Sequence, residues 1–200
     1  MKRFDPDEFV AACVEAVGTP TDAAGAVREL LAHAVDDPTA LARVLPEATS
    51  GPMMQRWFCS DDLTVLHIVW PPGVELAAHD HDMFAAIGIY GGREDNSFFR
   101  RNAGGTLQRS GGRTLLAGDT AVLGRRAVHA VTNPTRDWTA AIHVYGGNFF
   151  TADRTTWSDL DAPGEPLDAS TISTHLEEAA GVARRADLRS SAARRRRRSV

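Results

Sequence analysis

Between residues 52 and 150 the chain is a succession of short segments rich in Val, Ile, Phe and Thr, separated by clusters of Gly, Pro, Asn and Asp. Such segments predict short β-strands joined by turns. No helical pattern lies between them, so the strands are expected to form an antiparallel sandwich or barrel. The expected strands are 53–59, 63–70, 82–90, 96–101, 113–117, 120–123, 128–132 and 138–145.

The residues before this region predict a helical cap over the strand core. Asp5-Pro6 combines an N-cap residue with proline at the first helical position, and Gly18 ends the apolar run that follows. Thr19-Pro20 and Asp37-Pro38 predict the starts of two further helices, the last of which ends at Pro46.

The residues after the strands predict a loop to about residue 168 and then a polar helix over about 170–189. The arginine run Arg194–Arg198 has no apolar partner to bury and is expected to be disordered. The expected organisation is therefore a helical cap (1–47), a β-barrel domain (48–160), a C-terminal loop and helix (161–189) and a disordered Arg-rich tail (190–200).

Composition and charge restrict the class of protein. With 43% hydrophobic and 24% charged residues, the 200-residue chain is typical of one globular domain. Residues 184–200 carry a net charge of +7, so residues 1–183 are acidic at −11, which argues against nucleic acid as a specific ligand. No apolar run approaches the ~20 residues of a membrane span, and no secretory signal is evident. Cys13 and Cys59 have neither zinc nor redox spacing, so a cytoplasmic location is expected.

Three histidines in the strand region suggest a metal site. His79 and His81 are two residues apart, so on a strand both side chains point to the same face, and His129 lies in a later strand segment. Three neutral imidazoles that converge inside a barrel can bind zinc, iron, nickel or copper. Asp80 and Asp82 are expected to point away from the histidines into solvent.

The glycines before these histidines have a characteristic spacing. Gly73 precedes His79 by six residues, and Gly118 precedes His129 by eleven. These spacings resemble the two cupin motifs, in which a double-stranded β-barrel holds one metal ion. The resemblance covers about half of the chain and implies a mainly β, cupin-type barrel with an N-terminal helical cap and a C-terminal helix.

One difference from the usual cupin motif points to a particular group of cupins. Where the first cupin motif usually has a glutamate ligand, this chain has Ala85 and Ala86, so the implied ligands are three histidines without a carboxylate. Three-histidine cupins are typical of thiol dioxygenases, the cysteine and 3-mercaptopropionate dioxygenase group. The segments HDHDMFAAIGIYGG and AAIHVYGGNFF resemble the histidine motif of that group and the strand that carries its Ser-X-His-X-Tyr triad.

The second segment implies two catalytic residues. His143 and Tyr145 occupy the His and Tyr positions of the triad and share one strand face, so both are expected to reach the metal cavity. Ala141 stands at the serine position, so one member of the relay is missing. The resemblance implies that Tyr145 and His143 donate hydrogen bonds during oxidation of the substrate.

The resemblance also implies an arginine that binds the substrate carboxylate. Arg154, nine residues after Tyr145, matches the position used by the bacterial 3-mercaptopropionate branch, and Arg56 lies near the position used by the cysteine branch. The guanidinium fork suits a carboxylate because it binds both oxygens. The implied enzyme holds Fe(II) and oxidises a small thiol carboxylate with O2 to a sulfinate.

Two other classes of protein stay open on the sequence. One is a different metal-dependent cupin enzyme, a lyase, isomerase or other dioxygenase that acts on a small acid. The other is a non-catalytic cupin that binds a small ligand. Metal content together with O2 uptake on small thiols distinguishes the three. The expected partners are the thiol substrate and O2, with no membrane and no specific nucleic acid, and the oligomeric state stays open.

Overall fold

The computed structural model describes residues 4–18, 22–45 and 51–198, with the backbone alone described for 190–198. Three helices come first, α1 (Pro6–Val17), α2 (Ala23–Val35) and α3 (Pro38–Ala42), and the helix α4 (Ala169–Arg198) comes last. The strands between them are β1 (Met54–Cys59), β2 (Thr64–Trp70), β3 (Glu75–His79), β4 (Ala85–Gly91), β5 (Arg93–Arg101), β6 (Leu107–Leu116), β7 (Thr120–Leu123), β8 (Val128–Thr132), β9 (Thr139–Tyr145), β10 (Arg154–Trp157) and β11 (Glu165–Leu167).

The strands form two antiparallel sheets, with the orders β1-β2-β9-β4-β7 and β11-β10-β3-β8-β5-β6. β5 and β6 make a hairpin, and the pairs β4–β7, β3–β8 and β2–β9 continue that antiparallel ribbon. Because successive pairs of the ribbon lie in alternate sheets, the ribbon winds as a double-stranded β-helix. The predicted fold class is therefore confirmed, with one difference: the two sheets do not close into a single hydrogen-bonded barrel.

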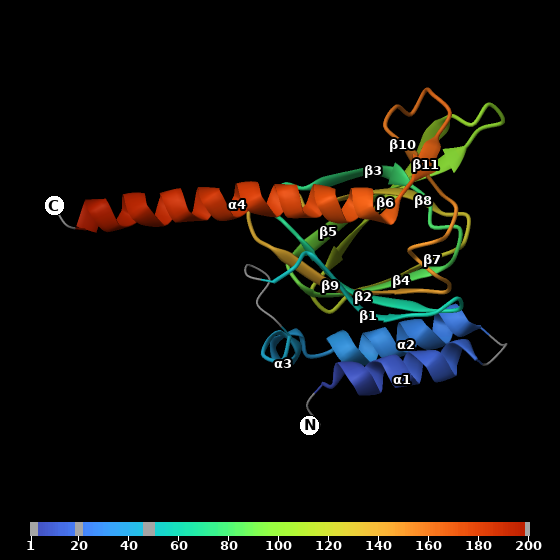
Figure 1. Cartoon of the computed structure of the whole chain (residues 1–200), viewed down its shortest axis with the longest axis horizontal. Coiled ribbons are helices and arrows are strands. Elements are labelled where there is room, and N and C mark those ends of the chain that lie inside the picture. Colours follow the sequence, from blue (N-terminus) through green and yellow to red (C-terminus); the bar gives the residue numbers. More distant parts are fainter. Residues whose placement is uncertain (1–3, 19–21, 46–50, 199–200) are drawn as a thin grey trace.

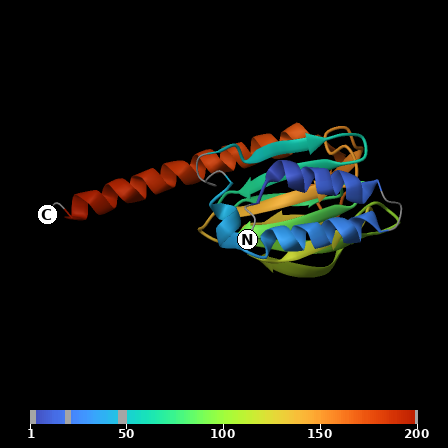
Figure 2. The ribbon, with the colours of Figure 1, turned by 90° about the horizontal axis from the view of Figure 1, so that it is seen from below.

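Helices α1 to α3 cover the outer face of the first sheet (Figures 1 and 2). The central strands β2 and β9 are consequently buried on both faces along their whole length. Gly88 on β4 lets α2 approach the sheet closely, because a Cβ atom there would lie 3.1 Å from side-chain atoms of both Leu31 and Val35. The cap is thus packed directly on the strands that carry the inner cavity.

Aspartates start the three cap helices. The Asp5 side chain accepts hydrogen bonds from first-turn amides of α1, and Asp37 does the same for α3, as the Asp-Pro pairs predict. Asp22 caps α2. The expected start at Thr19-Pro20 and the expected end at Pro46 lie outside the described residues.

Three of the observed strands are not expected from the sequence, and a fourth begins earlier than expected. β3 has the sequence ELAAH, with little β propensity, and β10 and β11 lie in a stretch expected to be a loop. β3 pairs with both β8 and β10, so its hydrogen bonds come from segments distant in the chain. β6 begins at Leu107, earlier than the expected residue 113, because it completes the long hairpin with β5.

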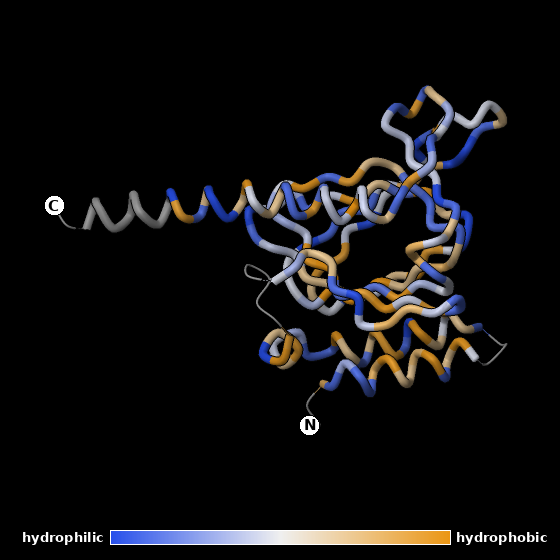
Figure 3. The backbone as a smooth tube through the Cα atoms, viewed as in Figure 1, coloured by the Kyte–Doolittle hydropathy of each residue, from blue (hydrophilic) through white to orange (hydrophobic). Residues whose placement is uncertain are grey.

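α4 covers an open side of the two sheets and then extends beyond the body of the protein (Figures 1 and 2). The helix is mostly hydrophilic (Figure 3), but one stripe of it belongs to the inner core. The stripe consists of Ala169, Ile172, Leu176 and Ala180. Farther along, Val182 and Leu188 are 62% and 70% exposed, so the helix packs on the sheets only through its first part.

The C-terminal tail also differs from the expectation. The sequence predicts a helix that ends near residue 189 and a disordered segment 190–200, but α4 continues to Arg198. Ala and Arg are strong helix formers, and extending an existing helix is far easier than starting one. Among the described residues, the helices include none of the length and hydropathy required to cross a membrane.

Candidate metal centre

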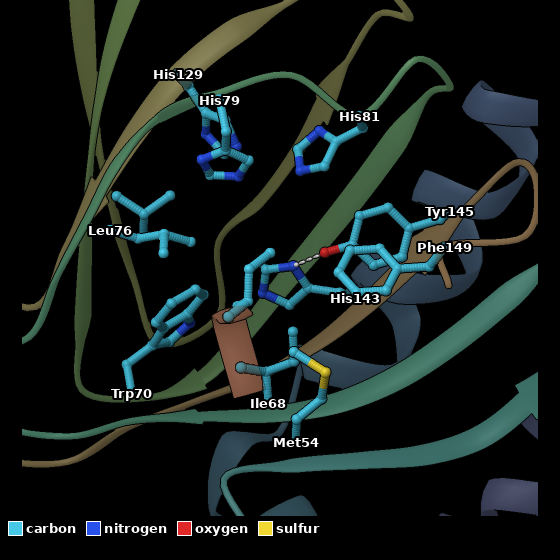
Figure 4. Close-up of a pocket in the computed structure, with 12 residues that line it drawn as sticks. Met54, Ile68, Trp70, Leu76, His79, His81, His129, His143, Tyr145 and Phe149 are labelled. Carbon is cyan, nitrogen blue, oxygen red and sulfur yellow. Dashed lines mark hydrogen bonds between the residues drawn. The ribbon is translucent and has the colours of Figure 1, made fainter. Parts of the chain in front are cut away.

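His79, His81 and His129 meet in the space between the two sheets (Figure 4). His79 ends β3 and is the register partner of His129 on β8, while His81 follows in the turn after β3. One ligand atom from each histidine lies within 4.8 Å of the other two, and all three side chains are buried. The motif glycines Gly73 and Gly118 have φ values of +71° and +94° in the turns that precede β3 and β7. The three predicted ligands therefore form one group of metal-binding geometry.

Burial keeps these three imidazoles neutral, as metal ligands must be. It lowers the pKa of His79 to about 4 and holds the pKa values of His81 and His129 well below the usual range. Neighbouring imidazoles add to this effect at His81 and His129, and the positive charge of Arg154 adds to it at His79 and His81.

Hydrogen bonds orient two of the rings toward a shared point. His79 Nδ1 donates to the Ala77 carbonyl (2.9 Å), and His129 Nδ1 donates to Asn96 Oδ1 (2.7 Å), so Nε2 of each ring carries a lone pair. Within the described chain, His129 Nε2 and His81 Nδ1 are buried without a hydrogen-bond partner. A bound transition metal ion would satisfy such buried nitrogens, so the donor set fits zinc, iron, nickel or copper.

The two aspartates beside the histidines differ from each other. Asp82 is exposed and pairs with Arg125, as expected of a solvated residue. Asp80 is only 8% exposed, contrary to the expectation. It pairs with Arg101 and accepts a hydrogen bond from the Thr155 amide (2.8 Å). Thr155 belongs to β10, which pairs with β3. Asp80 therefore connects the turn that carries His81 to β10 instead of facing water.

His143 and Tyr145 line the same cavity from β9 (Figure 4). His143 Nδ1 lies 3.2 Å from the Tyr145 hydroxyl, and the Tyr145 ring centroid lies 5.3 Å from that of His81. Burial lowers the pKa of His143 to about 3 and raises the pKa of Tyr145 above its usual value. Both groups are therefore neutral at neutral pH and available for hydrogen bonding.

Glu94 and Asn96 are buried polar residues of the site that the sequence analysis misses. Both lie on β5, and the Asn96 amide joins the candidate metal ligand His129 to the Glu94 carboxylate. The second Glu94 oxygen lies 3.7 Å from His143 Nε2. The sequence could have indicated their burial through the alternation of side chains along a strand. Glu94 and Asn96 share one strand face with Phe98, which packs on the inner core.

The rest of the cavity wall is apolar and leaves little room. Its apolar residues are Met54, Ile68, Trp70, Leu76, Val131, Phe149 and, from α4, Ile172. The free space among these side chains and the histidines is about 10 Å³, roughly enough for one water molecule. A molecule of several atoms therefore enters only if wall side chains move, and Ile172 makes α4 part of that wall.

The structure separates the two predicted arginines. Arg154 on β10 is 3% exposed, and its guanidinium carbon lies 4.0 Å from the centroid of the Phe149 ring. The ring centroids of Phe149 and Tyr145 lie 4.6 Å apart, so a continuous series of contacts leads from Arg154 to the cavity. Arg56 is exposed over Phe150, beside a separate groove that shares only Met54 with the histidine cavity.

No family model matches the chain. Among solved structures, it is similar to an uncharacterised double-stranded β-helix protein of Klebsiella pneumoniae, with 18% identity, a TM-score of 0.42 and coverage of 58% of this chain and 88% of that one. A cupin 2 conserved barrel protein of Salinispora arenicola has 22% identity, a TM-score of 0.37 and coverage of 46% and 72%.

Oxalate decarboxylase of Bacillus subtilis has 14% identity and a TM-score of 0.40, over 50% of this chain and 25% of that enzyme. At these scores the likenesses are distant, whereas the ribbon topology and the register of the strands are properties of the chain itself. The chain has the double-stranded β-helix fold of the cupins, with a buried group of three histidines that can hold a metal ion.

Proposed function

We propose that this protein is a non-heme Fe(II) enzyme of the thiol dioxygenase type, which oxidises a small thiol carboxylate with O2 to a sulfinate. The reaction RSH + O2 → RSO2H transfers both oxygen atoms to sulfur and needs no further reductant. Bound iron would supply the redox chemistry with O2 and a positive charge that favours the thiolate form of the substrate. His79, His81 and His129 would hold the ion.

The observation that carries this proposal is the buried guanidinium of Arg154, with two nitrogens that make no hydrogen bond to described residues, beside a three-histidine site. Among the described residues, Nε and Nη1 of Arg154 are buried without a hydrogen-bond partner. Burial lowers the pKa of Arg154, and Asp168 and Asp80 are near enough to oppose this shift but leave these two nitrogens without a hydrogen bond. A substrate carboxylate would bind the guanidinium edge that Nη2 forms with Nε or with Nη1. The histidines add no negative charge to offset a divalent cation. The site therefore suits a substrate with two anionic groups, as a thiolate with a carboxylate has.

The other side chains of the cavity have roles consistent with this chemistry. The Tyr145 hydroxyl, next to His81, is available to hydrogen-bond the reacting groups, and His143 contacts that hydroxyl. The apolar wall excludes water, which strengthens each of these polar interactions. A substrate with three carbon atoms is larger than the free space of the cavity, so its binding requires displacement of wall residues such as Ile172.

The test begins with the full chain reconstituted with Fe(II) without air. We expect one iron per chain, and O2 uptake equal to sulfinate formation with 3-mercaptopropionate or cysteine. A matched thiol that lacks the carboxylate, 2-mercaptoethanol, should react poorly, and Arg154→Gln should remove that preference. Arg136→Gln, at an exposed arginine, is the control variant.

Two outcomes contradict the proposal. Iron bound in full, with no O2 uptake on any small thiol acid, points to a different metal-dependent cupin enzyme. Absence of metal binding, with a small ligand still bound, points to a non-catalytic cupin.

A further inference from the structure

A chain of buried polar side chains crosses the inner cavity from a metal ligand to Tyr145. His129 Nδ1 donates to Asn96 Oδ1 (2.7 Å), and Asn96 Nδ2 donates to Glu94 Oε1 (2.9 Å). Glu94 Oε2 then faces His143 Nε2 at 3.7 Å, and His143 Nδ1 lies 3.2 Å from the Tyr145 hydroxyl. β5 and β9 belong to different sheets, so the contact between Glu94 and His143 links the two sheets.

In the described structure Glu94 Oε2 and His143 Nε2 face each other, and neither atom has a partner within hydrogen-bond distance. The Trp70 indole N–H is also buried without a partner, and it offsets part of the rise that burial causes in the pKa of Glu94, so it is a second donor beside the same carboxylate. Glu94 and His143 are 1% and 3% exposed. Leaving both groups unpaired in the interior is costly, whereas an imidazole N–H and a carboxylate oxygen satisfy each other. A shift of well under 1 Å brings 3.7 Å to hydrogen-bond distance.

We propose that Glu94 is a positioning residue of the site, which holds His143 through one carboxylate oxygen and Asn96 through the other. It thereby orients both the histidine that contacts Tyr145 and the amide that fixes the metal ligand His129. Ala141 on β9 has no hydroxyl group to hold His143, and Glu94 supplies the missing partner from the opposite sheet. The inference rests on the proposed function only for the reaction that the site performs. The contacts of Glu94 with Asn96 and His143 do not depend on that reaction.

The proposal makes a definite statement about the proton on His143. In the chain without metal and substrate, an ionised Glu94 accepts a hydrogen bond from Nε2–H of His143, so His143 Nδ1 has the lone pair and accepts from the Tyr145 hydroxyl. A glutamine at position 94 keeps the hydrogen bond from Asn96, but its NH2 group faces His143 and donates. His143 must then carry its proton on Nδ1 and donate to the tyrosine oxygen.

The experiment measures this proton directly in the metal-free full chain. The tautomer of His143 is read from its ring ¹⁵N chemical shifts at pH 8.5, with the resonance assigned by its loss in His143→Gln. Burial raises the pKa of Glu94 to about 7, so its carboxylate is ionised at this pH. We expect the Nε2–H tautomer in the wild type, the Nδ1–H tautomer in Glu94→Gln, and a mixture in Glu94→Ala.

The matched control is Asp95→Asn, the same carboxylate-to-amide change at the next residue. Asp95 pairs with Arg93 and Thr114, away from His143, so its replacement should leave the tautomer unchanged. The same tautomer of His143 in the wild type and in both Glu94 variants overturns the proposal. Glu94→Gln preserves the shape of the side chain, so the comparison stands even if Glu94→Ala does not fold.

A second measurement tests the branch toward the metal ligand. In a Co(II) titration followed by visible absorption, Glu94→Ala should bind the ion about tenfold more weakly, because Asn96 loses the group that fixes its amide. Asp95→Asn should bind like the wild type, and equal affinity in Glu94→Ala refutes this branch. Neither measurement involves thiol oxidation. A negative thiol assay with the expected tautomers rejects only the proposed function, and thiol oxidation with unchanged tautomers rejects only the role of Glu94.

Discussion

His79 on β3 is the cross-strand partner of His129 on β8, and the centroids of their rings lie 4.6 Å apart. Two imidazolium cations this close in a buried site repel each other, and His79 lowers the pKa of His129. Their neutral forms direct lone pairs at the same space as His81. The pairing of β3 with β8 is thus what converts distant histidines into a ligand group.

Replacement of any one of the three histidines by alanine is expected to abolish stoichiometric iron binding, because two imidazoles leave the ion weakly held. Metal analysis of the reconstituted chain measures this. His33→Ala, at an exposed histidine of α2, is the control and should bind iron normally. Full iron occupancy in the triple variant would disprove the site.

The buried histidines predict a marked loss of stability in mild acid. Five of the seven histidines are buried and have lowered pKa values: His67, His79, His81, His129 and His143. Because the unfolded chain binds more protons, their contribution is complete above pH 6.5 and is lost as the pH falls through about 4. A single histidine shifted to a pKa of about 4 accounts for roughly 3 kcal/mol.

Glu94 has the opposite effect on the pH dependence of stability. Burial raises its pKa to about 7 from 4.5, so its contribution to stability falls as the pH rises through that interval. Five histidines outweigh one carboxyl, so the net expectation is unfolding of the metal-free chain between pH 6.5 and 4. Circular dichroism against pH measures it, and a Tm that is constant from pH 7 to 4.5 contradicts it.

Tyr145→Phe is expected to keep the metal and slow the oxidation. The hydroxyl is not part of the ligand group, but it lies beside His81 and contacts His143. Loss of one hydrogen bond to the reacting groups raises the barrier by ~1–3 kcal/mol. Iron content and kcat are measured together, and an unchanged kcat assigns Tyr145 a packing role only.

Arg154 is expected to be the anchor of the substrate carboxylate. Arg154→Ala removes the partner of the substrate carboxylate from a buried charge pair, a loss of ~3–5 kcal/mol, or at least about a hundredfold in kcat/KM. Arg154→Lys keeps the charge without the fork and should weaken binding without loss of iron. Arg56→Ala, at the exposed arginine, should cost much less. If neither arginine variant changes kcat/KM for any thiol acid, the substrate is not a small carboxylate.

Deletion of residues 190–200 is expected to leave Tm and turnover unchanged. The buried stripe of α4 ends at Ala180, and Leu188 is already 70% exposed, so the deleted segment follows a part of the helix that has left the core. The matched comparison is Ile172→Ala, which opens the cavity wall and should cost ~2–5 kcal/mol of stability. A large fall in Tm after the deletion shows that the end of α4 docks on another surface.

Local signals in the sequence account for the helical cap, the strands of the first sheet and the choice of His79, His81 and His129. Asp-Pro pairs start helices through contacts within one turn, and β2 and β9 read as strands because both of their faces are buried. The motif spacing identifies the histidines through its resemblance to the two cupin motifs.

Contacts between segments distant in the chain determine the other features of the fold and the site. β3 (ELAAH) has weak local propensity and β10 (RTTW) is only four residues long, and both become strands because each finds hydrogen-bond partners in the second sheet. Glu94 and His143 are 49 positions apart in the chain and lie on different sheets, so no spacing rule connects them. The burial of Arg154, the exposure of Arg56 and the inward stripe of α4 likewise depend on packing between distant segments, which local sequence patterns do not encode.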